Sequence, residues 1–158
     1  MSRIRSHAND ETGQALVEFA LVLPVLLIVL LGMLDFGKAF NYWMDTTQIA
    51  AEGARYAAVN RKPAPGDAAT LQQQLLSQAD TTELRDGGSA SLPTAAEVCI
   101  SFPNGTSNPG DPVQVSMTFT YQWLAFLGSN AGLTTKTVSA KSTMRLEAIP
   151  TNYSAACA

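Results

Sequence analysis

One block near the start of the chain is almost wholly apolar. Residues 15–34 read ALVEFALVLPVLLIVLLGML, with Glu18 as the only charged side chain. As a helix this block would rise roughly 30 Å, which matches the hydrocarbon thickness of a bilayer. No small-x-small cleavage pattern follows it, because the chain continues Asp35, Phe36, Gly37, Lys38. The pattern predicts one membrane-spanning helix that stays attached as an anchor.

Helical periodicity continues beyond this block. Large side chains recur at spacings of three and four, and a group of small ones follows: Phe36, Phe40, Trp43, Met44 and Thr47, then Ala50, Gly53, Ala54, Ala57 and Ala58. The pattern predicts a helix over residues 14–60, which would reach roughly 70 Å. We expect the face from Phe36 to Met44 to seat the chain's own sheet. Two interpretations of the small-residue face stay open: it packs on that sheet, or it packs against other helices in an assembled bundle.

A shorter helix is expected after a break. Two prolines and a glycine in residues 61–66 cannot extend the long helix. Asp67 is placed to cap the next helix, whose narrow apolar stripe would lie on the surface. The stripe consists of Leu71, Leu75, Leu76 and Ala79.

Strand patterns occupy the rest of the chain. Apolar and polar side chains alternate strictly over residues 113–122, which predicts a strand with one face in the core. We expect two further strands, over residues 98–102 and about 135–148. The second would have four apolar side chains on one side: Val138, Ala140, Met144 and Leu146. In the connection 123–133 we expect Trp123, Leu124, Phe126 and Leu127 to fill the core, the alternative being an exposed docking patch. The predicted fold is α+β, with a long N-terminal transmembrane helix that extends out of the membrane and packs on a small antiparallel sheet of three or more strands.

Composition and charge fit this organisation. The chain has 158 residues, 46% of them hydrophobic, and a formal net charge of -3. This length is enough for one domain and one membrane anchor. The chain has no cluster of Lys and Arg, so we expect no nucleic-acid binding. Arg3 and Arg5 precede the apolar block and Lys38 is the only basic residue soon after it, which favours a cytoplasmic N-terminus. The downstream strands, turns and cysteines suit a domain outside the cytoplasm.

Few residues suggest catalysis or metal binding. The only histidine, His7, lies ahead of the apolar block, and the downstream carboxylates have no paired spacing. A Ser/Lys nucleophile is the one catalytic class left open, and we predict neither enzyme activity nor a cofactor. Cys99 and Cys157 lie in no CxxC or Cys/His cluster, so no metal site is expected. Export would permit a disulfide between them that closes a loop of 59 residues and stabilises by roughly 4 kcal/mol, although the sequence does not fix the pairing.

Glu18 and Pro24 stand out inside the apolar block. A carboxylate at the bilayer centre costs about 2 to 3 kcal/mol, so Glu18 either has a partner or reaches back to the headgroups as a boundary residue. Pro24 lacks a backbone N–H and should kink or open the helix locally, unless it is simply a tolerated membrane proline.

The chain resembles a known family in its first sixty residues. The resemblance is carried by GQALVEF from Gly13, ALVLP ending at Pro24, LDFG over residues 34–37 and AAEGARYAA over residues 50–58. These segments closely resemble the TadE-like family of the bacterial tight-adherence (Tad, or Flp) pilus machinery. The resemblance implies a pilin-like fold. Phe19 stands where the major Flp pilins carry tyrosine, which favours the minor class.

The resemblance also implies how the helix is processed and used. A prepilin peptidase would cut between Gly13 and Gln14, making Glu18 the fifth residue of the mature chain, and Glu18, Phe19 and Pro24 would serve assembly. The expected parts are then a cytoplasmic leader (1–13), a transmembrane and extended helix (14–60) and an extracytoplasmic α+β domain (61–158). Expected partners are the inner membrane, the peptidase, other pilin and pseudopilin subunits, and the Tad assembly platform. The alternative is a signal-anchored periplasmic adaptor or sensor that never enters a filament.

Overall fold

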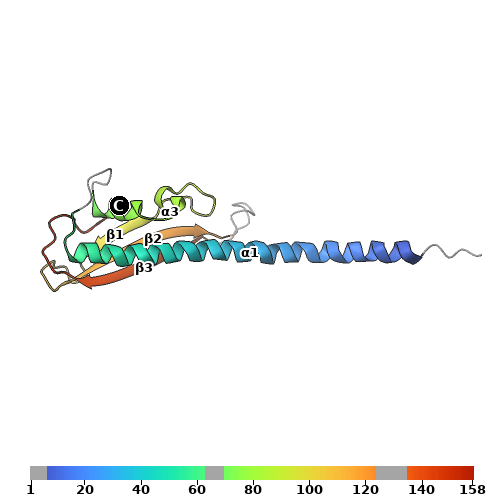
Figure 1. Ribbon diagram of the computed structural model, residues 1–158, viewed down its shortest axis with the longest axis horizontal. Helices are drawn as coiled ribbons and strands as arrows, with labels where there is room; N and C mark the ends of the chain where they lie inside the picture. The colour runs from blue at the N-terminus through green and yellow to red at the C-terminus, as the bar shows by residue number, and fades with distance from the viewer. Residues whose placement is uncertain (1–6, 63–69, 124–134) are drawn as a thin grey trace, which may run out of the picture. The chain divides into compact units, whose positions relative to one another are not determined.

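The computed structural model describes residues 7–62, 70–123 and 135–158, with side chains from Gly13 onward. Within these residues, three helices and four strands follow one another: α1 His7–Ala58, α2 Leu71–Ser77, α3 Thr82–Asp86, β1 Glu97–Ser101, β2 Pro112–Gln122, β3 Thr135–Arg145 and β4 Ala156–Cys157 (Figure 1). The chain divides into two compact units, Met1–Gly37 and Lys38–Ala158. The second unit holds a helix packed on an antiparallel sheet, which confirms the predicted α+β class.

The helix α1 ends where an asparagine adopts a left-handed backbone. Asn60 has φ 51°, and asparagine is the residue besides glycine that tolerates this conformation best. Its N–H donates to the carbonyl of Ala57 at 3.0 Å, and the N–H of Arg61 donates to the carbonyl of Tyr56 at 2.9 Å. These two bonds form a Schellman motif, so the helix stops before the proline-rich segment.

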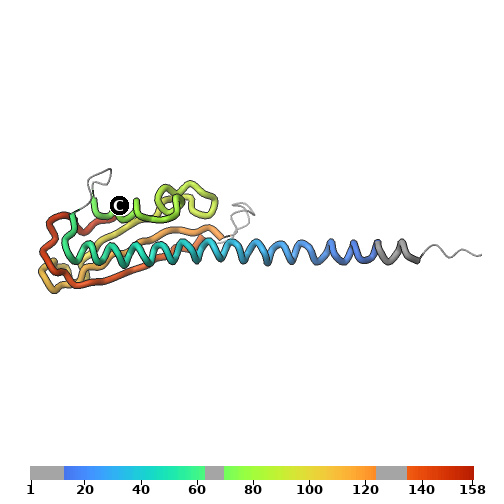
Figure 2. Tube along the Cα trace, in the orientation of Figure 1, coloured from blue at the N-terminus to red at the C-terminus, as the bar shows by residue number. Residues whose placement is uncertain are grey.

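Four antiparallel strands form one sheet in the order β3-β2-β1-β4. Inward and outward side chains alternate along the whole of β2, as predicted, and β2 pairs with all eleven residues of β3. In β3 the predicted apolar side is buried at Ala140, while Met144 is exposed. Figure 2 shows the path of these strands beside the second half of α1, and the two-residue β4 adds to the far edge of β1.

The face of α1 that seats the sheet differs from the predicted one. Phe40, Trp43 and Met44 are 48%, 45% and 54% exposed, so the expectation that they seat the sheet is wrong. The buried face instead carries mainly small side chains: Ala39, Tyr42, Thr46, Ile49, Ala50, Gly53, Ala54, Ala57 and Ala58. Small side chains let the helix axis come close to the strands, and this close contact settles the open interpretation of that face in favour of the sheet.

Gly53 marks the closest approach between α1 and the rest of the domain. A Cβ added there would lie 2.7 Å from Leu75 Cδ1 of α2 and 3.0 Å from Val115 Cγ1 of β2. About three turns towards the N-terminus of α1, the Tyr42 ring packs against Phe119 and Tyr121 with centroid distances of 6.1 and 6.0 Å. A single apolar core therefore joins α1, α2 and the sheet.

The short helix α2 is more deeply buried than its pattern predicts. Its N-cap is Thr70, whose hydroxyl accepts from the N–H of Gln73, and not the predicted Asp67, which lies outside the described residues. Leu71 and Leu75 are buried as expected, but Gln72 and Gln74 are buried as well. The Gln72 amide donates to the carbonyls of Ser154 and Ala156 at 3.1 and 3.2 Å, which accounts for its burial.

Part of the apolar connection after β2 falls outside the described residues. Leu124, Phe126 and Leu127 lie there, so their prediction stays untested. Trp123 is described, and its half-buried ring packs edge-on against Tyr121 at 5.0 Å.

Candidate assembly site on the N-terminal helix

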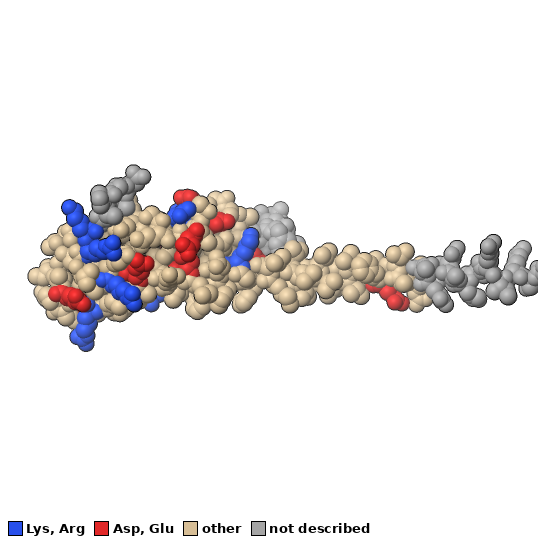
Figure 3. Space-filling view, in the orientation of Figure 1, with Lys and Arg blue, Asp and Glu red and all other residues tan. Residues whose placement is uncertain are grey.

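In the first unit, the described side chains of α1 are nearly all apolar and exposed. Leu16, Val17, Phe19 and Leu21 are each at least 60% exposed, and the helix is long and apolar enough to cross a membrane. Figure 3 shows this segment as a stretch of helix almost free of blue and red atoms, whereas charged side chains are spread over the Lys38–Ala158 unit. Because burying such a surface in lipid is favourable, the unit fits a single membrane anchor.

The carboxylate of Glu18 has a hydrogen-bond donor within its own chain. The side-chain amide of Gln14 donates to Glu18 Oε1 at 3.1 Å, across one turn of α1. Side chains four residues apart face each other on a helix, so the spacing of Gln14 and Glu18 places the pair on one face. One carboxylate oxygen is thereby satisfied, and Oε2 has capacity to accept a further donor.

Gly13 has no packing reason to be glycine. Apart from its chain neighbours and the backbone of its own helix, no described atom lies within 4 Å of a Cβ built at this position. The same is true at Gly32 and Gly37, whereas a Cβ at Gly53 would overlap the core. Glycine inside a helix costs about 1 kcal/mol relative to alanine. Because Gly32 and Gly37 of the same helix are equally open, the open space alone does not distinguish Gly13 from them.

Phe19 and Pro24 lie on the same apolar segment as Glu18. Phe19 is 60% exposed. Pro24 lies inside α1, which is assigned as a continuous helix across it. Because proline has no N–H, the carbonyl one turn earlier, at Ala20, loses its usual helical donor.

A second surface of interest lies on the α1 part of the Lys38–Ala158 unit. We call Phe40, Trp43 and Met44 the outer stripe, because the sheet lies on the other side of this helix segment. The Phe40 and Trp43 rings pack against each other at 5.7 Å. Hydrophobicity alone placed these residues inside. The clustering of small side chains on the opposite face is the signal that would have placed them outside.

Cys99 and Cys157 form a disulfide that ties β4 to β1. Their Cα atoms are 4.0 Å apart, and the two residues face each other in the strand register. A carboxylate oxygen of Glu97 lies within 4.8 Å of both sulfurs, a spacing that resembles a metal site. Since both sulfurs are joined in the disulfide, they are not available as thiolate ligands.

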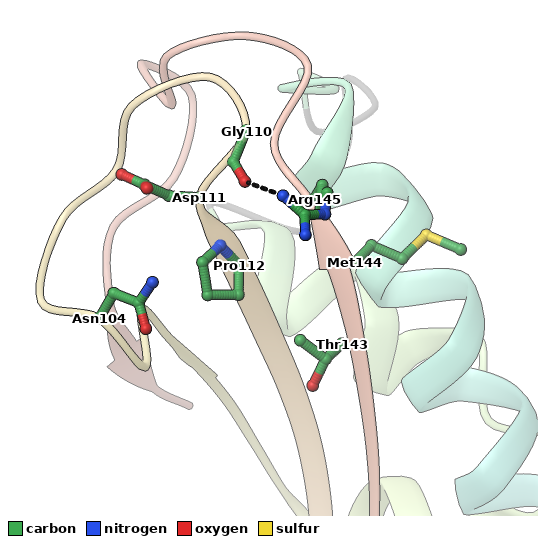
Figure 4. Close-up of a pocket in the computed structure, with 7 residues that line it drawn as sticks. All are labelled: Asn104, Gly110, Asp111, Pro112, Thr143, Met144 and Arg145. Carbon is green, nitrogen blue, oxygen red and sulfur yellow. Dashed lines mark hydrogen bonds between the residues drawn. The ribbon is translucent and has the colours of Figure 1, made fainter.

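A polar hollow of about 500 Å³ lies where the β2 and β3 ends meet the loop between β1 and β2 (Figure 4). Arg145 donates to the carbonyl of Gly110 at 3.2 Å, and the Asp111 carboxylate accepts from the N–H of Asn108 at 2.9 Å. Hydrogen bonds from the Thr106 side chain and the Asn108 backbone lower the pKa of the Asp111 carboxyl. These hydrogen bonds hold the loop between β1 and β2 in place. We therefore interpret the hollow as a by-product of the loop's structure and not as a binding site.

Comparison with protein families finds a match to part of the chain. The model of the family described as "TadE-like protein" matches residues 13–55, which confirms the resemblance over that part of the chain. The matched region begins at Gly13 and includes Gln14, Glu18 and most of the helix that seats the sheet. Neither the curated proteins nor the solved structures yield a match.

Proposed function

We propose that this protein is a minor pilin or pseudopilin-like subunit of a bacterial Tad (Flp) pilus system, anchored in the inner membrane and supporting pilus assembly and adhesion. Its role is structural, not enzymatic. The observation that carries the proposal is a carboxylate, Glu18, inside an exposed apolar helix at the start of the TadE-like match. The N-terminus lies in the cytoplasm and the sheet-bearing domain outside it.

The proposed mechanism begins with removal of the leader. Cutting after Gly13 creates a positively charged amine on Gln14, four residues before Glu18. A neighbouring subunit displaced along the helix axis brings its amine to the Glu18 carboxylate, and the pair is strong because lipid screens it poorly. Before the cut, residues 1–13 are a polar leader with two Arg, one Asp and one Glu, which resists withdrawal from the cytoplasmic face. Processing therefore gates assembly.

The outer stripe supports the same proposal. Three large apolar side chains on a helix segment outside the apolar block are costly to leave in water, by roughly 25 cal/mol for each Å² of apolar surface. Contact with other pilin and pseudopilin subunits or with the assembly platform would cover them. The sheet on the opposite side stays available for the exterior of the assembly.

Substitution of Glu18 tests the proposal. Two differently tagged copies, expressed with the other Tad components, are co-purified from mild detergent, and surface pili are counted. Glu18→Ala is expected to lower the co-purified amount and the number of pili by more than about tenfold each, since removing one partner of a buried ion pair costs about 3–5 kcal/mol. Leu16→Ala, an exposed apolar change on the same segment, is the matched control and should leave both unchanged. Normal assembly of Glu18→Ala, with the first thirteen residues retained, would favour the periplasmic adaptor instead.

A further inference from the structure

The residue that the proposed cut would place at the N-terminus is chemically unstable there. In a terminal glutamine, the lone pair of the α-amine can attack the side-chain amide carbon. A bond from the α-nitrogen to Cδ forms, the bond from Cδ to Nε2 breaks, and ammonia leaves with a proton taken from the amine. The product is a five-membered lactam, pyroglutamate, which needs no other reactant. Ring closure would convert the charged amine of Gln14 into a neutral amide.

The structure holds the Gln14 amide away from the position that ring closure requires. Its Nε2 donates to Glu18 Oε1 at 3.1 Å, one turn towards the C-terminus. To close the ring, Cδ must instead fold back onto the α-nitrogen of its own residue, and it cannot do both at once. The hydrogen bond to a carboxylate is of the charge-assisted kind, which is stronger than a neutral one.

We propose that Glu18 protects the mature N-terminus from cyclisation by holding the Gln14 side-chain amide one turn away. This role rests on the proposed cleavage after Gly13 and adds to the pairing of Glu18 with a neighbour's amine. The hydrogen bond keeps the electrophilic Cδ of Gln14 away from its own α-nitrogen. Glu18 thus preserves the positive charge on which subunit pairing depends.

Intact mass spectrometry tests this role on the full-length processed chain. The protein is extracted from peptidase-competent cells and incubated in detergent at mildly alkaline pH, and the loss of one ammonia is followed over time. Glu18→Ala should lose ammonia about three- to tenfold faster than the unmodified sequence, the range that one net hydrogen bond supports. Gln14→Ala cannot cyclise and fixes the baseline for ammonia lost elsewhere, and Leu16→Ala should behave as the unmodified sequence.

The outcomes separate this role from the proposed function. A chain cut after Gly13 whose Glu18→Ala variant cyclises no faster overturns the protective role alone. A chain that keeps its leader in peptidase-competent cells has no terminal glutamine, and this result overturns both. To exclude an effect of the variant on cutting, the same rates are measured on chains whose Gln14 terminus is exposed by removing a cleavable tag, and equal rates there also overturn the protective role.

Discussion

Replacing Gly53 by alanine is a sharp test of how α1 packs on the domain. The added methyl would lie 2.7 Å from Leu75 Cδ1 and 3.0 Å from Val115 Cγ1, well inside the ordinary contact distance of about 3.5–4.0 Å. Both neighbours are fully buried, so neither side chain has open space to move into. Overpacking of this kind costs about 1–3 kcal/mol, and alanine's better helix propensity returns about 1 kcal/mol. The expected net change is a loss of about 0–2 kcal/mol.

The propensity term is measured separately at a neighbouring position. Ala51 lies on the exposed side of the same helix, so Ala51→Gly should cost about 1 kcal/mol from propensity alone. Unfolding in guanidinium, followed by tryptophan fluorescence of the full chain in detergent, measures both changes in stability, because the half-buried Trp123 ring packs against the core. If Gly53→Ala stabilises the domain by as much as Ala51→Gly destabilises it, no close approach exists at Gly53 and the packing account is wrong.

Three further predictions concern the disulfide, a tyrosine and the outer stripe. The Cys99→Ser, Cys157→Ser double variant should lose roughly 4 kcal/mol, because the bridge spans a sequence separation of 58; equal midpoints with and without reductant would contradict this. Burial raises the pKa of Tyr153 to about 12, above an ordinary value of about 10, so its stabilising contribution is complete below pH 10 and is lost as the pH rises towards 12. In the Tyr153→Phe variant, the ultraviolet titration of tyrosinate should lose one ionisation step near pH 12. Trp43→Ser should change domain stability by no more than about 0.5 kcal/mol while weakening association between subunits, and a large drop in the unfolding midpoint would show that Trp43 belongs to the core.

The sequence predicted most of the elements because each has a strong local pattern. The alternation of apolar and polar side chains predicted a strand over residues 113–122, and the structure has β2 at Pro112–Gln122. The long helix was expected over residues 14–60 and is observed at His7–Ala58. By contrast, the five-residue α3 and the two-residue β4 are too short for any periodicity to develop. They are held by tertiary contacts, such as the mutual hydrogen bonds between Val98 and Ala158.

The orientation of α1 could not be read from hydrophobicity. Phe40 and Trp43 are larger and more apolar than Ala50 or Gly53, so a ranking by transfer free energy places them inside. In the structure, close contact favours the small side chains, since a helix approaches a sheet only as near as its bulkiest inward residue allows. Strand order depends equally on contacts between distant residues, and no local signal placed β1 between β2 and β4.

For the candidate site, the sequence provided the residues and the structure added their arrangement. The sequence named Gln14 at the expected cleavage site and Glu18 for assembly, but the amide-to-carboxylate hydrogen bond between them at 3.1 Å follows only from the structure. Likewise the glycine at 13 was recognised by resemblance, and the open space around it removes a packing explanation.

The central claim is that the chain is cut between Gly13 and Gln14 before it assembles. Intact mass measurement of the membrane-extracted protein, from cells with and without an active prepilin peptidase, tests it most directly. The account predicts a chain that begins at Gln14 in the first cells and at Met1 or Ser2 in the second. A chain that retains residues 1–13 in both would contradict it.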